Sequence, residues 1–433
     1  MNLFFKYIKL IIYVLFLTYS LPLSALTIED TIKNTVKNNL TVKIGLEEIS
    51  EARESINAAL GEYKPDIKIS LTEKFSSTET TTASSSTTED KTSDTYSLIV
   101  NQNIYDGGKK NLGLERSKVV LDKQIQNFYI NLNNLILDAI DGYLTVQVYE
   151  KILEATTKNN QVISRIYNDT VQKEKLGTAS YVELINAESS YELSKSNLIM
   201  AQGNLNVGKN TFYRISGLKP IDLNNIINFN QEINEKTVKK NALKNNNELN
   251  ILKLDYKDAK LQLDIKKRDK LPSFDLTGDL SYNDNVASKG TETKSGSISA
   301  KLSIPIYQQG IVSSDIRKLT SNYLQSEYKI EDKKDSIALD ISLLLNNYEI
   351  YNSQLKSNLI QIKAHESSLE LIKNEYELGI ATFTNLIDQE EKLLNSRLAY
   401  IEKNKDLIMT YFRILSLEGE LLNTFKDYLP NIN

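Results

Sequence analysis

Hydrophobic residues recur along this chain with two different periods, and the longer period covers most of it. In that part the steps alternate between four and three residues, as in Leu121, Ile125 and Phe128. A sustained period of 3.5 residues predicts α-helices that wrap around their neighbours in left-handed coiled coils. The two longest helices are predicted at 108–175 and 310–377, and at 1.5 Å per residue each is about 100 Å long. Helices of roughly half that length are predicted at about 28–63, 180–214, 235–270 and 382–415.

The shorter period is two residues, and it is confined to the segments 66–105 and 273–306. Apolar residues there alternate with polar ones, as in Phe274-Asp275-Leu276-Thr277. Each segment is predicted to form two strands of about ten residues with one apolar and one polar face, which is typical of transmembrane β-barrels. Of the 20 residues from 76 to 95, 14 are Ser or Thr. That composition predicts a long outward-facing loop between the first two strands.

Four such strands form a sheet with two open edges, and an open edge in lipid leaves backbone groups without hydrogen bonds. We therefore expect the chain to share a barrel with copies of itself, which gives eight strands from two copies or twelve from three. The interior of an eight-stranded barrel is filled by side chains. Lys68, Asp275, Asp279 and Lys301 lie on the polar face and fit a water-filled lumen, so at least three protomers are expected. The predicted fold class is mainly α with a transmembrane β-barrel contribution.

The whole pattern occurs twice. The segment 176–185 returns at 378–387, and Asn39 is matched by Asn246. This repetition predicts a duplicated unit of long coiled-coil helices plus a β-hairpin. The predicted order along the chain is a signal peptide (1–25), a first repeat (26–217) with hairpin 66–105, long helix 108–175 and helix 180–214, a linker (218–234), a second repeat (235–417) with hairpin 273–306, long helix 310–377 and helix 382–415, and a C-terminal segment (418–433).

The first 25 residues have the pattern of an export signal. Lys6 and Lys9 precede an apolar run from Leu10 to Leu17, and Leu23-Ser24-Ala25 is a small-residue cleavage site. A transmembrane anchor is the alternative interpretation, although the run is short for a membrane span and ends at Pro22. A cleaved signal peptide would direct the chain out of the cytoplasm.

Composition narrows the class of function. The chain has no cysteine, which excludes disulfides, thiolate chemistry and cysteine-ligated metals, and its one histidine, His365, lies on a coiled-coil seam. A net charge of −4 with mixed signs gives no basic surface for nucleic acid. The segment Asp106-Gly107-Gly108-Lys109 lacks the spacing of a phosphate-binding loop. We therefore expect no catalytic set, metal site or cofactor, and the chain is not expected to be an enzyme.

The duplication, the two hairpins and the motif Leu-Gly-x-x-[AST]-x-x-x-[LV]-[IL] at 176–185 and 378–387 resemble the TolC family of outer-membrane efflux proteins. The resemblance implies a homotrimer, with a 12-stranded β-barrel in outer-membrane lipid and a 12-helix α-barrel in the periplasm. The linker 218–234 and the segment 418–433 would form an equatorial collar. The implied function is a passive export duct for efflux or type I secretion, working with a periplasmic adaptor (membrane fusion) protein and an inner-membrane pump or ABC exporter. The alternative is a non-conducting periplasmic or surface scaffold made of coiled coils.

The resemblance also assigns a role to the two Leu-Gly turns, which in that family lie at the periplasmic tip and contact the adaptor. The matching residues are Gly177, Thr178, Ala179 and Ser180 in the first turn, and Gly379, Ile380, Ala381 and Thr382 in the second.

A gate at the same tip would involve Glu183, Tyr376, Asn385 and Asp388. Glu183 and Tyr376 match a pair that latches the two hairpins together. Asn385 and Asp388 match two rings of carboxylates, of which only Asp388 keeps its charge. Ala381 stands where the family has an arginine, so the bond of that arginine is not expected here. In the alternative interpretation Asp388 is a solvated charge on a helix face, and Tyr376 belongs to ordinary seam packing.

Overall fold

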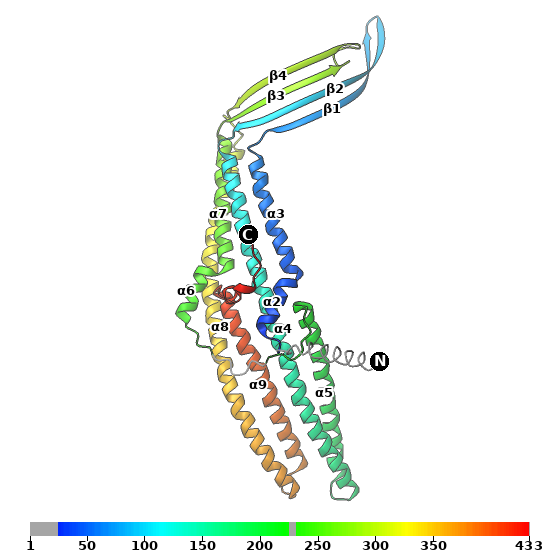
Figure 1. Ribbon diagram of the computed structural model, residues 1–433, viewed down its shortest axis with the longest axis vertical. Helices are drawn as coiled ribbons and strands as arrows, with labels where there is room; N and C mark the ends of the chain where they lie inside the picture. The colour runs from blue at the N-terminus through cyan, green and yellow to red at the C-terminus, as the bar shows by residue number, and fades with distance from the viewer. Residues whose placement is uncertain (1–24, 225–230, 433) are drawn as a thin grey trace, which may run out of the picture. The chain divides into compact units, whose positions relative to one another are not determined.

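The computed structural model describes residues 25–224 and 231–432 (Figure 1). The predicted signal peptide, 1–25, lies outside the described residues except for its last position, and so does part of the predicted linker, 218–234. Within the described ranges, no helix combines the length and the apolar character that a membrane-spanning helix needs.

The chain forms two compact units, each built from separate stretches of sequence. The helical unit contains the described residues of 1–43, 129–246 and 336–433, and the sheet unit contains 44–128 and 247–335. Each unit takes segments from both predicted repeats, so the division of the chain into two repeats stays a prediction.

The sheet unit holds one antiparallel sheet, in which each strand pairs with the next along the chain. Its strands are β1 (Asp66–Thr82), β2 (Ser85–Tyr105), β3 (Ser273–Asp284) and β4 (Glu292–Ser303). The register places Leu280 opposite Leu98 and Asp275 opposite Lys301. Most facing pairs match apolar with apolar or polar with polar, with exceptions such as Ile99 opposite Asp279 and Gln102 opposite Leu276. The sheet therefore has one mainly apolar and one mainly polar face.

The Ser/Thr-rich segment 76–95 is part of a β-hairpin, and the prediction of a long loop there was wrong. β1 and β2 pair from Asp66 opposite Asn101 out to Thr82 opposite Ser85. Pairing between β2 and β3 extends outward only to Asp94, so the hairpin continues beyond that point as a two-stranded ribbon (Figure 1). Threonine is β-branched and favours extended backbone, whereas Ser/Thr composition alone does not reveal whether two segments pair.

The helices of the sheet unit come from four places in the sequence. They are α3 (Leu40–Gly61), α7 (Asn247–Lys267) with the 3-10 turn η1 (Arg268–Lys270), and the first parts of α4 (Lys109–Lys175) and α8 (Ile311–Glu377). Ion pairs join α4 to α7. Arg116 Nε lies 2.7 Å from Asp258 Oδ1, and Lys123 Nζ lies 2.5 Å from Asp255 Oδ1.

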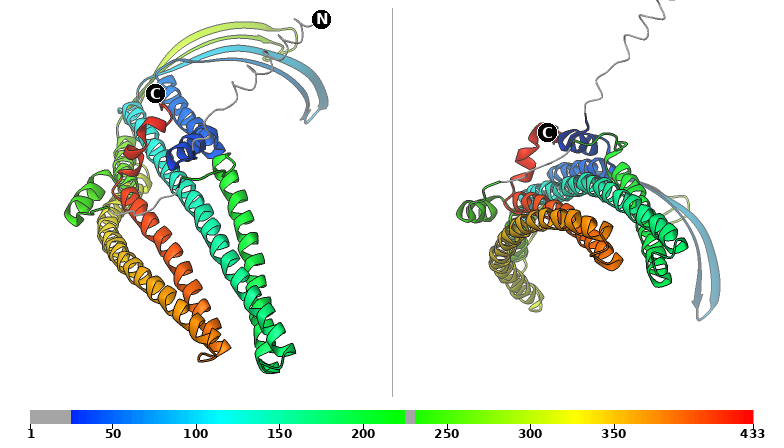
Figure 2. Two further views of the ribbon diagram at one scale, coloured as in Figure 1. Left: turned by 60° about the horizontal axis from the view of Figure 1, so that its bottom comes forward. Right: turned by 90° about the horizontal axis from the view of Figure 1, so that it is seen from below.

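The helical unit contains the later parts of α4 and α8 together with the helices that pack on them. These are α2 (Ile28–Asn38), α5 (Tyr181–Ser216), α6 (Glu235–Asn245), α9 (Phe383–Leu417), α10 (Leu421–Thr424) and the 3-10 turn η2 (Lys426–Tyr428). Within this unit the pairs α4/α5 and α8/α9 lie side by side in a curved layer (Figure 2). Lys405 of α9 joins the pairs, because its Nζ lies 2.9 Å from Asp141 Oδ1 and 2.7 Å from Thr145 Oγ1 of α4.

The α4/α5 seam is narrow because small residues of α5 repeat along it every seven positions. The buried members of this row are Ala187, Ser194, Ala201 and Gly208. A Cβ atom on Gly208 would lie only 2.8 Å from the ring of Tyr149, so glycine there makes room for the tyrosine. This close approach is the coiled-coil packing that the 3.5-residue period predicts.

Two helices that the sequence pattern predicts as continuous, 28–63 and 235–270, are each broken by an asparagine. Asn39 separates α2 from α3, and Asn246 separates α6 from α7. The side-chain amide of Asn39 donates to the carbonyl of Ile215 at 3.3 Å, and that of Asn246 donates to the carbonyl of Leu417 at 3.0 Å. An asparagine that bonds backbone elsewhere favours a break over a helix interior, and the break recurs in both halves of the chain.

Candidate functional site

One face of the sheet exposes a band of large apolar side chains. Ile67 and Ile69 of β1 are 62% and 74% exposed, and Ile298 of β4 is 83% exposed. At the outer end of this face Tyr96 and Tyr282 pack with their ring centroids 5.9 Å apart. From Phe274 to Tyr282 the apolar row measures about 26 Å along β3 at 3.3 Å per residue. An apolar band of about that height, with aromatic residues at its limit, fits contact with lipid.

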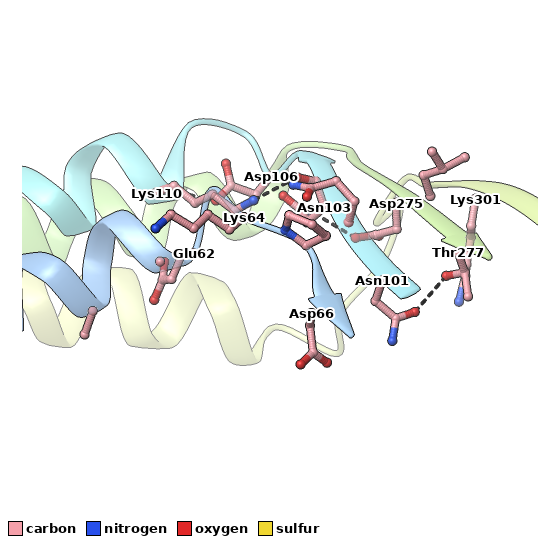
Figure 3. A pocket seen from close by; sticks show the side chains of 15 residues that line it. Glu62, Lys64, Asp66, Asn101, Asn103, Asp106, Lys110, Asp275, Thr277 and Lys301 are labelled. Carbon is pink, nitrogen blue, oxygen red and sulfur yellow. Dashed lines mark hydrogen bonds between the residues drawn. The ribbon is translucent and has the colours of Figure 1, made fainter. Parts of the chain in front are cut away.

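The opposite face is polar, and at its inner end it lines an open cavity of about 880 Å³ (Figure 3). Asn103 donates to Asp275 Oδ1 at 2.8 Å, and Thr277 donates to Asn101 Oδ1 at 3.0 Å. Two of the predicted lumen residues, Asp275 and Lys301, lie in this wall. The face therefore presents charged and amide groups to water.

Asp106 lines this cavity just before the start of α4, and sequence reasoning missed its role. Its carboxylate accepts from the backbone N–H groups of Gly108, Lys109 and Lys110 at 2.9, 3.0 and 2.8 Å. Those N–H groups are free at the start of α4, so the carboxylate caps the helix. An aspartate followed by two glycines and a helix was the available signal.

The sheet has two unpaired edges. Within the described chain β1 pairs only with β2, and β4 pairs only with β3. Both edge strands are largely exposed. Their outer N–H and C=O groups need partners if the sheet lies in lipid.

The two predicted tip turns have the same geometry. Gly177 and Gly379 adopt positive φ angles of 72° and 75°. Thr178 N–H donates to the carbonyl of Lys173 at 2.8 Å, and Ile380 N–H donates to that of Glu375 at 2.8 Å. These are the bonds of a Schellman turn, in which glycine at the left-handed position ends one helix before the next begins.

Apolar side chains stand out from both turns. Leu176 is 79% exposed in the first turn, and Leu378 and Ile380 are 75% and 72% exposed in the second. Ser180 and Thr382, from the predicted adaptor-contacting set, are the N-caps of α5 and α9.

Two of the predicted gate residues occupy capping positions. Glu183 accepts from Ser180 N–H at 2.8 Å, and Ser180 Oγ accepts in turn from Glu183 N–H at 3.2 Å, which is a complete capping box. Thr382 Oγ1 accepts from Asn385 N–H at 3.3 Å, so Asn385 stands at the equivalent place in α9. The Ser-x-x-Glu spacing is a readable capping signal that sequence reasoning did not use.

Tyr376 faces the other helical hairpin, but its contact there is Lys173. The Nζ atom of Lys173 lies 4.3 Å from the centroid of the Tyr376 ring, which is a cation–π contact between α4 and α8. Glu183 and Tyr376 are thus engaged with other groups here, and the latch between them stays a prediction. Asp388 is exposed on α9.

His, Asp and Glu side chains, which are common ligands of metal ions, occur among the residues that the structure describes. Groups of three or more His, Asp or Glu side chains that could hold a metal ion do not occur among them. His365, on its coiled-coil seam, lies with Nδ1 3.0 Å from the side-chain amide of Gln389.

Comparison with known proteins identifies the family. The family described as outer membrane efflux protein matches residues 31–218 and 238–419. Outer membrane protein TolC of Escherichia coli (strain K12) is 23% identical over 345 residues, which cover 75% of this chain and 69% of that protein. Outer membrane efflux protein BepC of Brucella suis biovar 1 (strain 1330) is 20% identical over 401 residues, covering 91% of this chain and 86% of that protein.

Solved structures with the same fold agree with this assignment. The Campylobacter jejuni CmeC outer membrane channel aligns with a TM-score of 0.79 at 13% identity, over 93% of this chain and 90% of that one. The outer membrane protein VceC of Vibrio cholerae aligns with a TM-score of 0.74 at 13% identity, over 90% and 96% of the two chains. The chain therefore belongs to the outer membrane efflux protein family, which places it in the bacterial outer membrane with its helices in the periplasm.

Proposed function

We propose that this chain is one protomer of a homotrimeric, passive export duct that is gated at its periplasmic helical tip. The observation that carries the proposal is the four-stranded sheet, which has an exposed apolar face, a polar face and two unpaired edges. Such a sheet is stable in lipid only when copies close it into a barrel.

The number of copies follows from the polar face. Two protomers would give eight strands, whose interior side chains would fill the barrel. Three protomers give twelve strands and leave a lumen. The cavity wall of Asp275, Asn101 and Thr277 then faces water, which suits these polar side chains.

The absence of cysteine makes the proposed β1–β4 contact between protomers directly testable. We would place one cysteine in β1, at Ser70, and a second in turn at Ser295, Ser297 and Ser299 of β4, and oxidise the purified protein. Because each chain then offers both edges, we expect at least one pair to give cross-linked dimers and trimers. The control pair Asn101→Cys and Thr277→Cys is directly opposite within one sheet and should link only within a chain. Dimers without trimers, or no intermolecular product from any pair, would contradict the trimer.

We further propose that the two turns dock a periplasmic adaptor protein, which couples the duct to an inner-membrane pump or ABC exporter. The proposed contact set is Gly177, Thr178, Ala179 and Ser180 with Gly379, Ile380, Ala381 and Thr382. The exposed side chain of Ile380 and the neighbouring Leu378 support this, because exposed apolar groups at a helical tip favour a protein partner.

The docking proposal is tested with a charge in the second turn. Ile380→Asp should abolish co-purification with the adaptor and export, while the trimer and its outer-membrane location remain. Ile360→Asp is the matched control, because Ile360 is 69% exposed on α8 outside the turn. Equal loss of adaptor co-purification and of export in both variants would contradict docking at the tip.

The gate is proposed to involve Glu183, Tyr376, Asn385 and Asp388. Three Asp388 carboxylates around one axis would repel anions and favour cations in the constriction. Opening would require the α4/α5 and α8/α9 hairpins to separate, which would break the contact between Lys173 and Tyr376. A reducible bifunctional thiol cross-linker joining Lys173→Cys to Tyr376→Cys should therefore hold the tip closed and stop export until it is cleaved; a direct disulfide is too short to replace two long side chains. Undiminished export by fully cross-linked protein would contradict this gate.

A further inference from the structure

A second cavity, of about 440 Å³, lies within the helical unit between α4, α8 and α9. Apolar side chains form part of its wall, among them Ile166 of α4 and Leu386 and Leu393 of α9. Leu386 and Leu393 are themselves 3% and 4% exposed, so this wall belongs to the packed interior. A cavity of this size with apolar walls is within the range of small-molecule sites.

Of the five carboxylates in the cavity lining, Glu390 is the only one that is not exposed. Glu390 lies between Leu386 and Leu393 on the same face of α9, since these positions are four before it and three after it. Burial raises the pKa of the Glu390 carboxyl, which the charges of Arg397 and Lys373 only partly offset. No described residue forms a hydrogen bond or ion pair with Glu390, and the guanidinium of Arg397 is bound to Glu366 at 2.7 Å instead.

The same cavity contains an aromatic ring that already holds a cation. Tyr376 lines the cavity, and Lys173 Nζ lies 4.3 Å from its centroid. An aromatic face and a carboxylate are the two groups that proteins combine to bind organic cations. The lining as a whole holds five carboxylates and four basic side chains, which is an excess of one negative charge.

We propose that this cavity is a binding site for an organic monocation with an apolar body. The charged centre of the ligand lies between the Tyr376 ring and the Glu390 carboxylate, and the apolar body lies against Ile166, Leu386 and Leu393. The ligand displaces the Lys173 ammonium from the ring. The site is formed by one chain and does not depend on the proposed conducting path or on the adaptor.

Isothermal titration of the full-length protein in a non-ionic detergent tests this proposal. The probe is tetraphenylphosphonium, and the control ligand is tetraphenylborate, which has the same shape and the opposite charge. We expect the cation to bind and the anion to bind much more weakly. No binding of the cation, or equal binding of both ions, would overturn the proposal.

Three variants locate the site. Glu390→Gln should weaken binding of the cation about tenfold or more, because a charged partner is lost. Glu391→Gln is the matched control, since it removes the same charge from the adjacent, exposed residue and should change affinity less than about twofold. Lys173→Gln should strengthen binding several-fold, because the competing ammonium is gone. Equal weakening of cation binding by the two glutamate variants, or no gain in affinity from Lys173→Gln, would overturn the proposal. Far-ultraviolet circular dichroism confirms that each variant is folded.

Discussion

At the scale of single residues, the tip shows side chains that serve helix ends as well as a proposed gate. Glu183 completes the capping box of α5, and Asn385 takes the equivalent position in α9. Glutamine also serves at this position of a capping box, so charge and capping can be separated by substitution.

Glu183→Gln should leave the start of α5 ordered, because the glutamine oxygen still accepts from Ser180 N–H. Ser180→Ala removes the cap and should destabilise the helix start by about 1 kcal/mol. Hydrogen–deuterium exchange of the peptide covering residues 178–190 measures both variants. Equal loss of protection would show that the charge of Glu183, rather than its capping bond, holds this end.

Glu418 provides a pH-dependent contribution to stability. Burial raises the pKa of its carboxyl in the folded protein, although a hydrogen bond of 3.0 Å from Asn241 partly opposes this shift. A raised folded pKa means that stability is greatest below the ordinary carboxyl pKa of about 4.3 and is lost as the pH rises through the folded value.

Glu418→Gln should therefore be more stable than the original protein at pH 7.5, and the difference should shrink toward pH 4. Thermal unfolding at several pH values, followed by circular dichroism, measures this. Glu391→Gln is the control, because it removes the same charge from an exposed residue of α9 and should change the stability less. A constant difference between the Glu418 variant and the original protein at all pH values would contradict the assignment.

At the scale of elements, the spacing of α3 and α4 depends on one missing side chain. A Cβ atom on Gly45 would lie 2.5 Å from the ring of Phe128. A Cβ atom on Gly113, in α4, would have no neighbouring atom within 4 Å. Gly45→Ala should cost about 1–3 kcal/mol through overpacking, whereas Gly113→Ala should gain about 0.5–1 kcal/mol from helix propensity. The melting temperature should therefore fall in Gly45→Ala and rise in Gly113→Ala. A higher melting temperature in both variants would show that α3 and α4 can move apart freely.

Periodicity predicted the kind of element well, because one apolar face must be buried whatever the partner. The strands of 273–306 and the helices α4 and α8 lie close to their predicted ranges. The breaks at Asn39 and Asn246 could not be predicted, since they depend on carbonyls of Ile215 and Leu417 far along the chain. The ribbon at 76–95 was mistaken for a loop because local composition does not reveal whether a segment pairs with another strand.

The candidate site was only partly predictable from the sequence. The positive φ of Gly177 and Gly379 follows from the motif, since glycine after a helix marks a reversal. The contact of Lys173 with Tyr376 and the burial of the Glu390 carboxylate depend on how α4, α8 and α9 pack. No spacing within one helix reports that packing.

At the scale of the whole molecule, an export duct requires a closed barrel and a conducting path through it. The unpaired edges of β1 and β4 imply association, and the polar face implies a wet lumen. A trimer without a conducting path would pair the strand edges but would not provide a lumen. Conduction is therefore the property that separates an export duct from a structural scaffold.

Single-channel conductance of the purified protein in planar lipid bilayers tests this claim most directly. We predict a small, steady, cation-preferring conductance, which increases when Asp388→Asn and Tyr376→Phe are combined and loses part of its cation preference through the Asp388 change. Protein that is shown to be folded, trimeric and inserted in the bilayer, and that nevertheless carries no current in either form, would contradict the duct.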